Sequence, residues 1–436
     1  MNETKSYLEL DDEPVKVQPN QSVFKPVASL QVKEGATATQ DANGNWVNAI
    51  GLQSTASHRH VAKQWQAQCT PFSDFVTEVN EQANYKRDIV KPESEIRLQD
   101  IETLVDGMPI NDAGLSSLRT LIGMPSSVLS YLTDNGYSDI ASKLLNEGMD
   151  KRAESWDFSG KKPREARVRV RHDDNGNDVI RAIVSERYGV IDNHEAIEMI
   201  VNSLPTLTDA LASHITHDGD DMFGNVLLPD NMKSEPDSDY GVGISFRNSE
   251  IRNSTFKVSP FLFRAICLNG MIWGRQDSAI QINQRHMGKI NTQELQEQVR
   301  TAIAVVLTQG NAMLTLLGHS KQVKVNNALP VIAQLTRDAK MTMEQGKAWH
   351  KGYLETLQET KGDVAENTAF GIVNGLTRSA QSYSGSLREA MESTASLILA
   401  PSIDSDLQSI SRRWGQVSDR ASSLKQDTVM QYAFVG

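Results

Sequence analysis

A cysteine and a histidine in the second half of the sequence could form a nucleophilic pair. His286 could deprotonate the thiol of Cys267, as in enzymes that form a covalent intermediate. However, seven of the residues from Phe261 to Leu268 are apolar, and apolar surroundings raise the pKa of a thiol. The sequence therefore favours a small buried core residue at Cys267 over a catalytic nucleophile.

Two histidines and three aspartates form a second candidate site, for a divalent metal ion. His214 and His217 precede Asp218, Asp220 and Asp221, and imidazole and carboxylate groups are ordinary metal ligands. On a β-strand, however, positions i and i+3 point to opposite faces, which separates the two imidazoles. The pattern therefore indicates a polar strand end that runs into an acidic turn. We expect no metal and no cofactor, and the sequence holds no Walker loop, Gly-x-Ser-x-Gly or His-Glu-x-x-His motif.

Basic residues form the third group, and they could bind phosphate. The stretch Lys161–His172 holds six Lys or Arg residues against one Glu. Its alternation of Arg and Val places Arg167, Arg169 and Arg171 on one face of a strand. A second basic region runs from Ile244 to Ile290. Its cations are Arg247, Arg252, Lys257, Arg264, Arg275, Arg285 and Lys289.

Two interpretations of these basic regions are open, a solvated strand face and a groove for nucleic acid. The formal net charge of −11 argues against binding through bulk charge, but phosphate contact depends on the local potential. Rings such as Tyr188 or Phe246 could stack on bases, although such rings more often pack in a core. The candidate nucleic-acid-binding residues are Arg167, Arg169, Arg171, Arg181, Tyr188, Arg247, Arg252, Arg264 and Arg285.

Arg264 is the one charged residue in an otherwise apolar segment, SPFLFRAICLNGMIWG. Ser259 and Pro260 are typical of a helix start, and Asn269-Gly270 is typical of a helix end, so the segment predicts a short buried helix. A buried guanidinium needs an anionic partner, because it stays protonated at ordinary pH. The alternatives are an internal carboxylate, such as Glu250 or Asp277, and a phosphate-binding groove lined by Arg247 and Arg285.

The secondary structure expected around these residues predicts an α+β fold. Alternating patterns and turn signals predict an antiparallel sheet from about residues 165–258, interrupted by one helix that begins near Asp192 or Asn193. Long helices after Asn291 back this sheet. Four regions are expected, namely a loosely ordered 1–95 with a hairpin at Asp41–Asn45, a small helical 96–150, an α+β core with long helices at 151–390, and a helical tail at 391–436.

The composition and the N-terminal residues predict a cytoplasmic protein. The sequence has no run of roughly 18 apolar residues, so we expect no membrane span. Its N-terminus is acidic and lacks the apolar core of a signal peptide. The two cysteines, Cys69 and Cys267, are then expected to be reduced thiols.

Four segments carry a resemblance to a known family. They read LSSLRTLIGMPSSVLSYL, VIRAIVSERYGVIDNHEAIEMI, GISFRNSEIRNSTFKVSPFLFRAICLNGMIWGRQDSAIQINQRHMG and NTAFGIVNGLTRSAQSY. In this order they resemble phage/plasmid-like proteins of unknown function (domain of unknown function 932), over about Glu95 to Tyr383. The resemblance supplies no established catalytic residue. It nominates Arg181, Ser185, Tyr188, Asn193, Arg264, Cys267, Asn269, Arg285 and His286.

The resemblance implies a gene carried by phages, plasmids or integrated elements of bacteria. A curved sheet with a basic face and a backing helix is one way to hold single-stranded nucleic acid, and annealing proteins of phage recombination share a broadly similar layout. The sequence thus predicts a non-enzymatic, oligomeric protein that binds or anneals single-stranded DNA. The rival hypothesis is an interaction protein, an anti-defence factor or phage assembly component, without nucleic-acid binding. A third is an enzyme that uses Cys267 or the His/Asp cluster.

Overall fold

The structure of the 436-residue chain is a computed structural model. It describes residues 69–104, 106–154, 164–173, 175–204, 210–235, 238–265, 269–273, 281–359, 365–400, 402 and 405–434, and three short strands before them. These strands are β1 (Thr39–Gln40), β2 (Trp46–Val47) and β3 (Gln53–Ser54). β1 and β2 pair antiparallel on either side of Asp41–Asn45, which confirms the predicted hairpin.

The largest sheet has seven antiparallel strands in the order β14-β13-β12-β11-β10-β4, with β15 paired to β13. Its strands are β4 (Thr70–Pro71), β10 (Leu211–His217), β11 (Asp221–Glu235), β12 (Ser238–Ser249), β13 (Phe256–Arg264), β14 (Asn269–Ile272) and β15 (Ile282–Gln284). The predicted strands between Leu211 and Val258 are therefore present. The α+β fold class is confirmed.

A separate three-stranded sheet holds the arginine-rich strand. Its order is β5-β8-β9, formed by β5 (Lys86–Pro92), β8 (Glu165–His172) and β9 (Asp178–Ser185). The prediction of one continuous sheet over 165–258 is therefore wrong. The hairpin of β8 and β9 pairs with a strand from earlier in the chain, because its apolar face packs on the first helices and not on the larger sheet.

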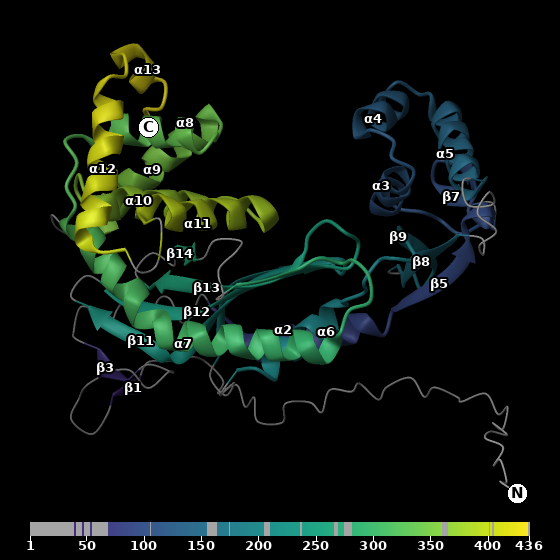
Figure 1. Cartoon of the computed structure of the whole chain (residues 1–436), viewed down its shortest axis with the longest axis horizontal. Helices are drawn as coiled ribbons and strands as arrows, with labels where there is room; N and C mark the ends of the chain where they lie inside the picture. The colour runs from purple at the N-terminus through teal and green to yellow at the C-terminus, as the bar shows by residue number, and fades with distance from the viewer. Residues whose placement is uncertain are drawn as a thin grey trace, which may run out of the picture.

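The molecule has two lobes, and each consists of one sheet and the helices packed on it (Figure 1). The N-terminal lobe joins the three-stranded sheet to α3 (Asp112–Leu121), α4 (Ser126–Asp134) and α5 (Ser138–Glu154). The main lobe joins the seven-stranded sheet to the other helices. These are α2 (Phe72–Ala83), α6 (Asn193–Val201), α7 (Thr292–Gln322), α8 (Ala328–Asp338), α9 (Met343–Glu359), α10 (Ala369–Ala380), α11 (Gly385–Leu399), α12 (Leu407–Ser422) and α13 (Gln426–Met430).

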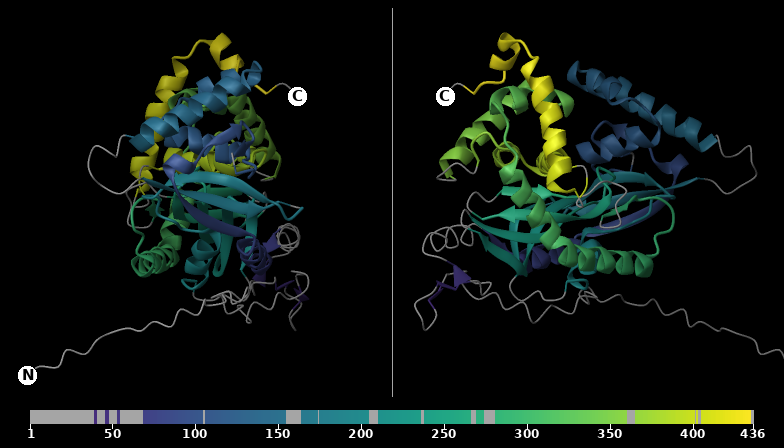
Figure 2. Two further views of the ribbon diagram at one scale, coloured as in Figure 1. Left: turned by 90° about the vertical axis from the view of Figure 1, so that its right-hand side faces the viewer. Right: turned by 60° about the vertical axis from the view of Figure 1, so that its left-hand side comes forward.

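The larger sheet is covered on both faces. α2, α6 and α7 lie on one face, whereas α10 and α11 lie on the other (Figures 1 and 2). The sequence signals for the helix starts hold, because the Asn291 side chain accepts the Glu294 N–H at 3.3 Å and Glu195 accepts the Asp192 N–H at 3.0 Å. Among the described residues, no single helix is long and apolar enough to cross a membrane, although the two halves of α7, bent by 46°, meet those criteria as a pair.

Two predictions for the region before residue 105 are wrong. Residues 69–95 were expected to be loosely ordered, but they form β4, α2, β5 and the 3-10 helix η1 (Glu93–Glu95). The rings of Phe72 and Phe75 make α2 part of the main core. The segment around Leu98–Leu104 has helical spacing but forms the hairpin of β6 (Leu98–Asp100) and β7 (Thr103–Leu104). The rest of the region predicted to be small and helical, 96–150, does form helices, namely α3, α4 and α5.

The predicted helix at SPFLFRAICLNGMIWG is also wrong, because its described parts form strands β13 and β14. Both faces of β13 are buried, so the apolar run has no polar positions to reveal a period of two. Leu262 packs in the main core, whereas Phe261 and Phe263 pack on the opposite face. Pro260 is tolerated because its carbonyl accepts the Trp273 N–H at 2.7 Å and its own nitrogen faces the same side, between β14 and β15.

The last helices are part of the main lobe. The predicted tail, 391–436, is helical as expected, but its boundary falls inside α11. Trp414 of α12 is 1% exposed and belongs to the same core as the sheet. Residues 391–434 therefore pack as an integral layer, which includes the last turns of α11 against β14.

Candidate functional site

The alternating arginines of β8 lie on one face, as the sequence predicted. Val168 and Val170 point into the core of the N-terminal lobe. Arg169 faces Asp88 on the neighbouring strand β5, with 3.0 Å between its Nε and Oδ1. Arg167 contacts the second oxygen of the same carboxylate at 2.9 Å. The arginine face of β8 is therefore directed at carboxylates of the protein itself.

Arg169 also connects the two lobes. Its side chain is 1% exposed and donates to the backbone carbonyl of Glu250 at 2.7 Å, at the end of β12 in the main lobe. Its third contact is an ion pair with Asp192, the residue before α6. Burial alone would lower the pKa of this guanidinium, but Asp192 and Asp88 outweigh burial and raise it. Arg169 is therefore a permanent cation inside the protein.

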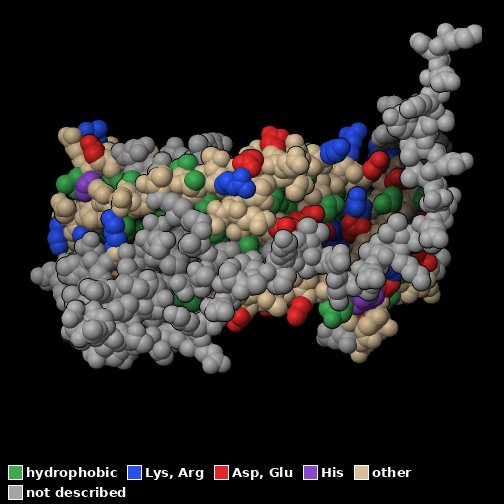
Figure 3. Space-filling view, turned by 90° about the horizontal axis from the view of Figure 1, so that it is seen from below, with side chains coloured by type: hydrophobic (Ala, Val, Ile, Leu, Met, Phe, Trp, Pro, Cys, Tyr) green, Lys and Arg blue, Asp and Glu red, His purple; other side chains and the backbone are tan. Residues whose placement is uncertain are grey.

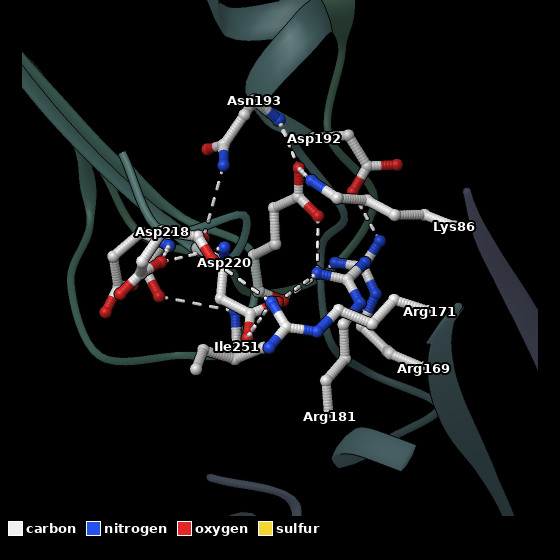
Figure 4. Close-up of polar contacts among 12 residues, drawn as sticks. Lys86, Arg169, Arg171, Arg181, Asp192, Asn193, Asp218, Asp220 and Ile251 are labelled. Atoms are coloured by element: carbon white, nitrogen blue, oxygen red, sulfur yellow. Dashed lines mark hydrogen bonds and ion pairs between the residues drawn. The ribbon is translucent and has the colours of Figure 1, made fainter. Parts of the chain in front are cut away.

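Glu250 is the central carboxylate of this contact between lobes, and Figure 4 labels three of the residues around it, Lys86, Arg181 and Asn193. It is fully buried and binds Lys86 at 2.9 Å, Arg181 at 2.5 Å and the backbone N–H of Asn193 at 2.7 Å. Burial raises its pKa, but the charges of Lys86, Arg181 and Arg169 prevail and lower the pKa to about 2. The carboxylate is therefore ionised at every physiological pH.

The acidic turn after β10 completes the arrangement. Asp220 binds Arg181 at 2.9 Å and Arg171 at 3.5 Å (Figure 4). Asp218 accepts the backbone N–H groups of Asp220 and Asp221 at 2.9 and 2.7 Å, which fixes the turn. We call this set the interlobe network, in which four cations meet four carboxylates. Its members are Lys86, Arg169, Arg171, Arg181, Asp88, Asp192, Asp220 and Glu250.

Tyr188 and His286 form a stacked pair beside the network. Their ring centroids are 5.2 Å apart with an interplanar angle of 9°, and the Tyr188 hydroxyl donates to the Glu250 carbonyl at 3.1 Å. His286 Nδ1 lies 3.0 Å from the Gly189 carbonyl, and burial lowers the pKa of His286. Burial raises the pKa of the Tyr188 hydroxyl. Tyr188 is 6% exposed and Phe246 is 1% exposed, so neither ring is available to stack on a base in this conformation.

Comparison with known proteins places part of the interlobe network inside a family match. A family model described as "Domain of unknown function (DUF932)" matches residues 180–398, half of the chain. The chain belongs to this family. No curated protein and no solved structure matches it. The DUF932 match includes Arg181, Asp220 and Glu250 but begins after β8, so the N-terminal lobe supplies cationic partners from outside the matched residues.

The remaining predicted residues fall in different places. Arg247 binds Glu389 of α11 at 2.7 Å. Arg264 is 3% exposed, as expected, but it lies at the end of a strand with its guanidinium 5.1 Å from the Phe370 ring centroid. Glu250, one of its expected partners, belongs to the interlobe network instead. The other expected partner, Asp277, lies outside the described residues.

The two enzyme candidates have separate outcomes. Cys267 lies outside the described residues, so its pairing with His286 stays a prediction. His214 and His217 are separated as the strand pattern predicted, with His214 beside Phe223 and His217 beside Phe75 of α2. Burial, aided by the charge of Arg388, lowers the pKa of His214 to about 4. Within the described chain, no group of three or more His, Cys, Asp or Glu side chains could hold a metal ion.

Four exposed cations near the Tyr188–His286 stack have no ion pair within the part of the chain that the structure describes. They are Arg187, Arg252, Arg285 and Lys289, which we call the cationic patch. Their segments touch, since the Gly288 N–H donates to the Arg187 carbonyl at 2.8 Å and Thr255 donates to Asn283 at 2.6 Å. Sequence reasoning selected Arg252 and Arg285 but missed Arg187, although it adjoins Tyr188 in a segment that carried the family resemblance.

Proposed function

We propose that this protein is a non-enzymatic protein of a mobile genetic element that binds single-stranded nucleic acid through the cationic patch. The observation that carries the proposal is the difference between two sets of cations. The arginines of the interlobe network are already neutralised by carboxylates, whereas the four cations of the patch are exposed and have none within the described chain. Exposed, uncompensated cations are the groups that exchange counterions for phosphates.

One face of the molecule lacks a long basic groove among its described side chains (Figure 3). On the face shown in Figure 3, the described Lys and Arg side chains are scattered among Asp and Glu and form no continuous stripe. Around the patch, Glu186 is an exposed carboxylate next to Arg187, so the patch keeps a net positive charge. Contact with a few phosphates is therefore the expected mode, without base stacking by Tyr188.

The test is fluorescence anisotropy with a labelled single-stranded oligonucleotide over a series of salt concentrations. Each phosphate contact contributes about −0.7 to the slope of log K against log salt, so four contacts give roughly −3. Arg285→Gln with Lys289→Gln should weaken binding and reduce the slope by about half. A matched control removes Arg300 and Arg420, which are exposed and paired with Glu297 and Asp338. Absence of binding at low salt, or equal weakening in the control, would refute the proposal.

A second candidate function, self-association, is favoured by apolar side chains exposed on the N-terminal lobe. On α4, α5 and the turn between them these are Val128, Tyr131, Tyr137, Ile140 and Leu144, and Tyr131 is 63% exposed. Exposed Asp139 and Lys143 flank Ile140 on α5. In a two-fold antiparallel pairing of α5 with a second copy, each Asp139 would meet the other copy's Lys143. The occupant that fits this face is therefore a second copy of the chain.

Mass measurement of the full chain, with and without the oligonucleotide, tests both functions together. Tyr131→Ser with Ile140→Ser should convert an oligomer to a monomer. Leu397→Ser, which removes an apolar side chain that is 42% exposed on α11, is the control and should leave the mass unchanged. A wild-type monomer at all concentrations would contradict the self-association proposal.

A further inference from the structure

One large apolar side chain lies exposed among the cations of the cationic patch. Met287 is 70% exposed, more than any other large apolar side chain in the described part of the chain. It follows Arg285 by two residues and precedes Lys289 by two. Single exposed apolar residues are common on protein surfaces, so the surroundings of Met287, and not its exposure alone, have to carry an inference.

The two neighbours of Met287 hold it at the surface. His286 is 8% exposed, and its ring stacks on that of Tyr188 with 5.2 Å between the centroids. On the other side, the Gly288 N–H donates to the Arg187 carbonyl at 2.8 Å. Met287 therefore lies between a buried ring and a backbone hydrogen bond, and its exposure is a fixed property of the loop.

Two glycines allow this loop to lie directly on the segment after β9. Gly288 has a φ of 70°, in the left-handed region that favours glycine. A Cβ at Gly189 would lie 2.8 Å from the Gly288 carbonyl oxygen, so the two backbones are in close contact. This contact brings the loop of Met287 against the segment that carries Arg187, a third cation of the patch.

This combination of groups fits single-stranded nucleic acid. Its phosphates match the cations of the patch, whereas its bases present flat faces that no pairing partner covers. A methionine thioether packs favourably against an aromatic ring, and its flexible side chain adapts to different shapes. Tyr188 is 6% exposed and cannot supply such a contact in this conformation. Met287 is the exposed apolar group beside these cations.

An anionic membrane would also offer phosphates beside apolar groups, but the loop is a poor anchor for it. A single myristoyl chain gives only marginal membrane binding, and one methionine side chain buries far less apolar surface than such a chain. One apolar side chain is sufficient for contact with one base and insufficient for a lipid surface. The nucleic acid is therefore the better match.

We propose that Met287 packs against the face of one base of the bound strand, while Arg187, Arg285 and Lys289 hold the phosphates on either side of that base. This inference rests on the proposed function and adds a base contact to the phosphate contacts. A contact with a ring face does not depend on the hydrogen-bonding groups of the base, so all four bases can make it. The protein should therefore prefer strands with bases over strands without them, with little dependence on base sequence.

Fluorescence anisotropy with two labelled strands of equal length tests this contact. One strand is an oligothymidylate, and the other has the same phosphates but an abasic sugar at every position. The full chain should bind the oligothymidylate roughly two- to tenfold more tightly, the range that a contact between sulfur and a ring gives. Met287→Ser should weaken binding of the oligothymidylate, remove most of this preference and leave the affinity for the abasic strand unchanged.

The salt dependence of binding separates Met287 from the cations. Met287→Ser removes no charge, so the slope of log K against log salt should stay the same. Arg285→Gln with Lys289→Gln should instead reduce the slope for both strands. Met287→Leu keeps an apolar side chain and should retain most of the preference. Met430→Ser removes a methionine that is 54% exposed on α13, so it is the matched control and should change neither affinity.

Three results would overturn the inference while the proposed function stands. They are equal affinity of the wild type for the two strands, equal weakening of both strands by Met287→Ser, and equal weakening of the oligothymidylate by Met287→Ser and Met430→Ser. Absence of binding to either strand would refute the proposed function and the inference with it. Binding to vesicles of phosphatidylserine and phosphatidylcholine that depends on Met287 would then assign the loop to a membrane surface.

Discussion

The interlobe network and the cationic patch share the turn that follows β12, with Glu250 in the network and Arg252 in the patch, and folding compensates their charges differently. In the network every carboxylate meets a cation, and Arg181 reaches both Asp220 and Glu250. In the cationic patch, Arg187, Arg252, Arg285 and Lys289 are exposed and have no ion pair within the described residues. The comparison teaches that a basic sequence pattern marks a ligand site only where folding leaves its charges uncompensated.

The largest expected effect is the loss of the central carboxylate of the network. Glu250→Gln leaves Lys86 buried without its anion and Arg181 with Asp220 alone, so it should lower the free energy of unfolding by about 3–5 kcal/mol. Arg285→Gln, in the cationic patch, should cost much less, because this cation is exposed and no described carboxylate depends on it. Urea denaturation measures both. Equal costs would remove the distinction between the two regions.

A second prediction concerns the coupling between the charges of Arg181 and Glu250, as distinct from the packing of their side chains. Replacing both partners, Arg181→Met with Glu250→Leu, should cost less than the sum of the two single replacements, because neither charge is left alone in the interior. A double-mutant cycle by denaturant unfolding gives the coupling energy. Additive costs would mean that the pair contributes only through packing.

Two buried groups, Glu250 of the network and His217 beside it, should also contribute to stability in different pH windows. Glu250 has a folded pKa of about 2 against an unfolded value of about 4.5, so its contribution is complete above pH 4.5 and is lost as the pH falls toward 2. His217, packed on Phe75 of α2, has a folded pKa below its unfolded value of 6.5, owing to burial first and Lys86 second. The folded state then binds fewer protons, and stability falls as the pH drops below about 6.5.

Unfolding free energies of the wild type, Glu250→Gln and His217→Gln against pH check these windows. His217→Gln should flatten the curve just below pH 6.5 and leave the acidic limb unchanged. Glu250→Gln should flatten the limb below pH 4.5. The comparison would not hold if either variant flattened both limbs.

The smallest expected effect lies on the turn that joins the two regions. Arg252 has a φ of 77°, in the left-handed region that favours glycine. Arg252→Gly should raise the free energy of unfolding by roughly 1 kcal/mol or less. Arg252→Ala removes the same charge but keeps the strained backbone, so it should give no gain in thermal denaturation. A gain in both variants would assign the effect to the removed charge.

Particular segments show where prediction from the sequence succeeds. The alternation in β8 placed its arginines on one face, and the separation of His214 from His217 followed from strand geometry. The prediction at β13 failed, because both of its faces are buried and its apolar run fits a helix equally well. The prediction of a helical region at β6 and β7 failed as well, because a few apolar residues at helical spacing do not distinguish a helix from a tight hairpin.

The sequence by itself determined the fold class, the pleat that aligns Arg167, Arg169 and Arg171, and the capping residues of several helices. These properties depend on neighbours within a few positions along the chain. Only the tertiary structure decided whether each arginine is free. The partners of Arg169 and Arg181 are 23 to 81 residues away, and contacts at such distances depend on how the two lobes close on each other. Charge compensation is therefore a property of the folded chain.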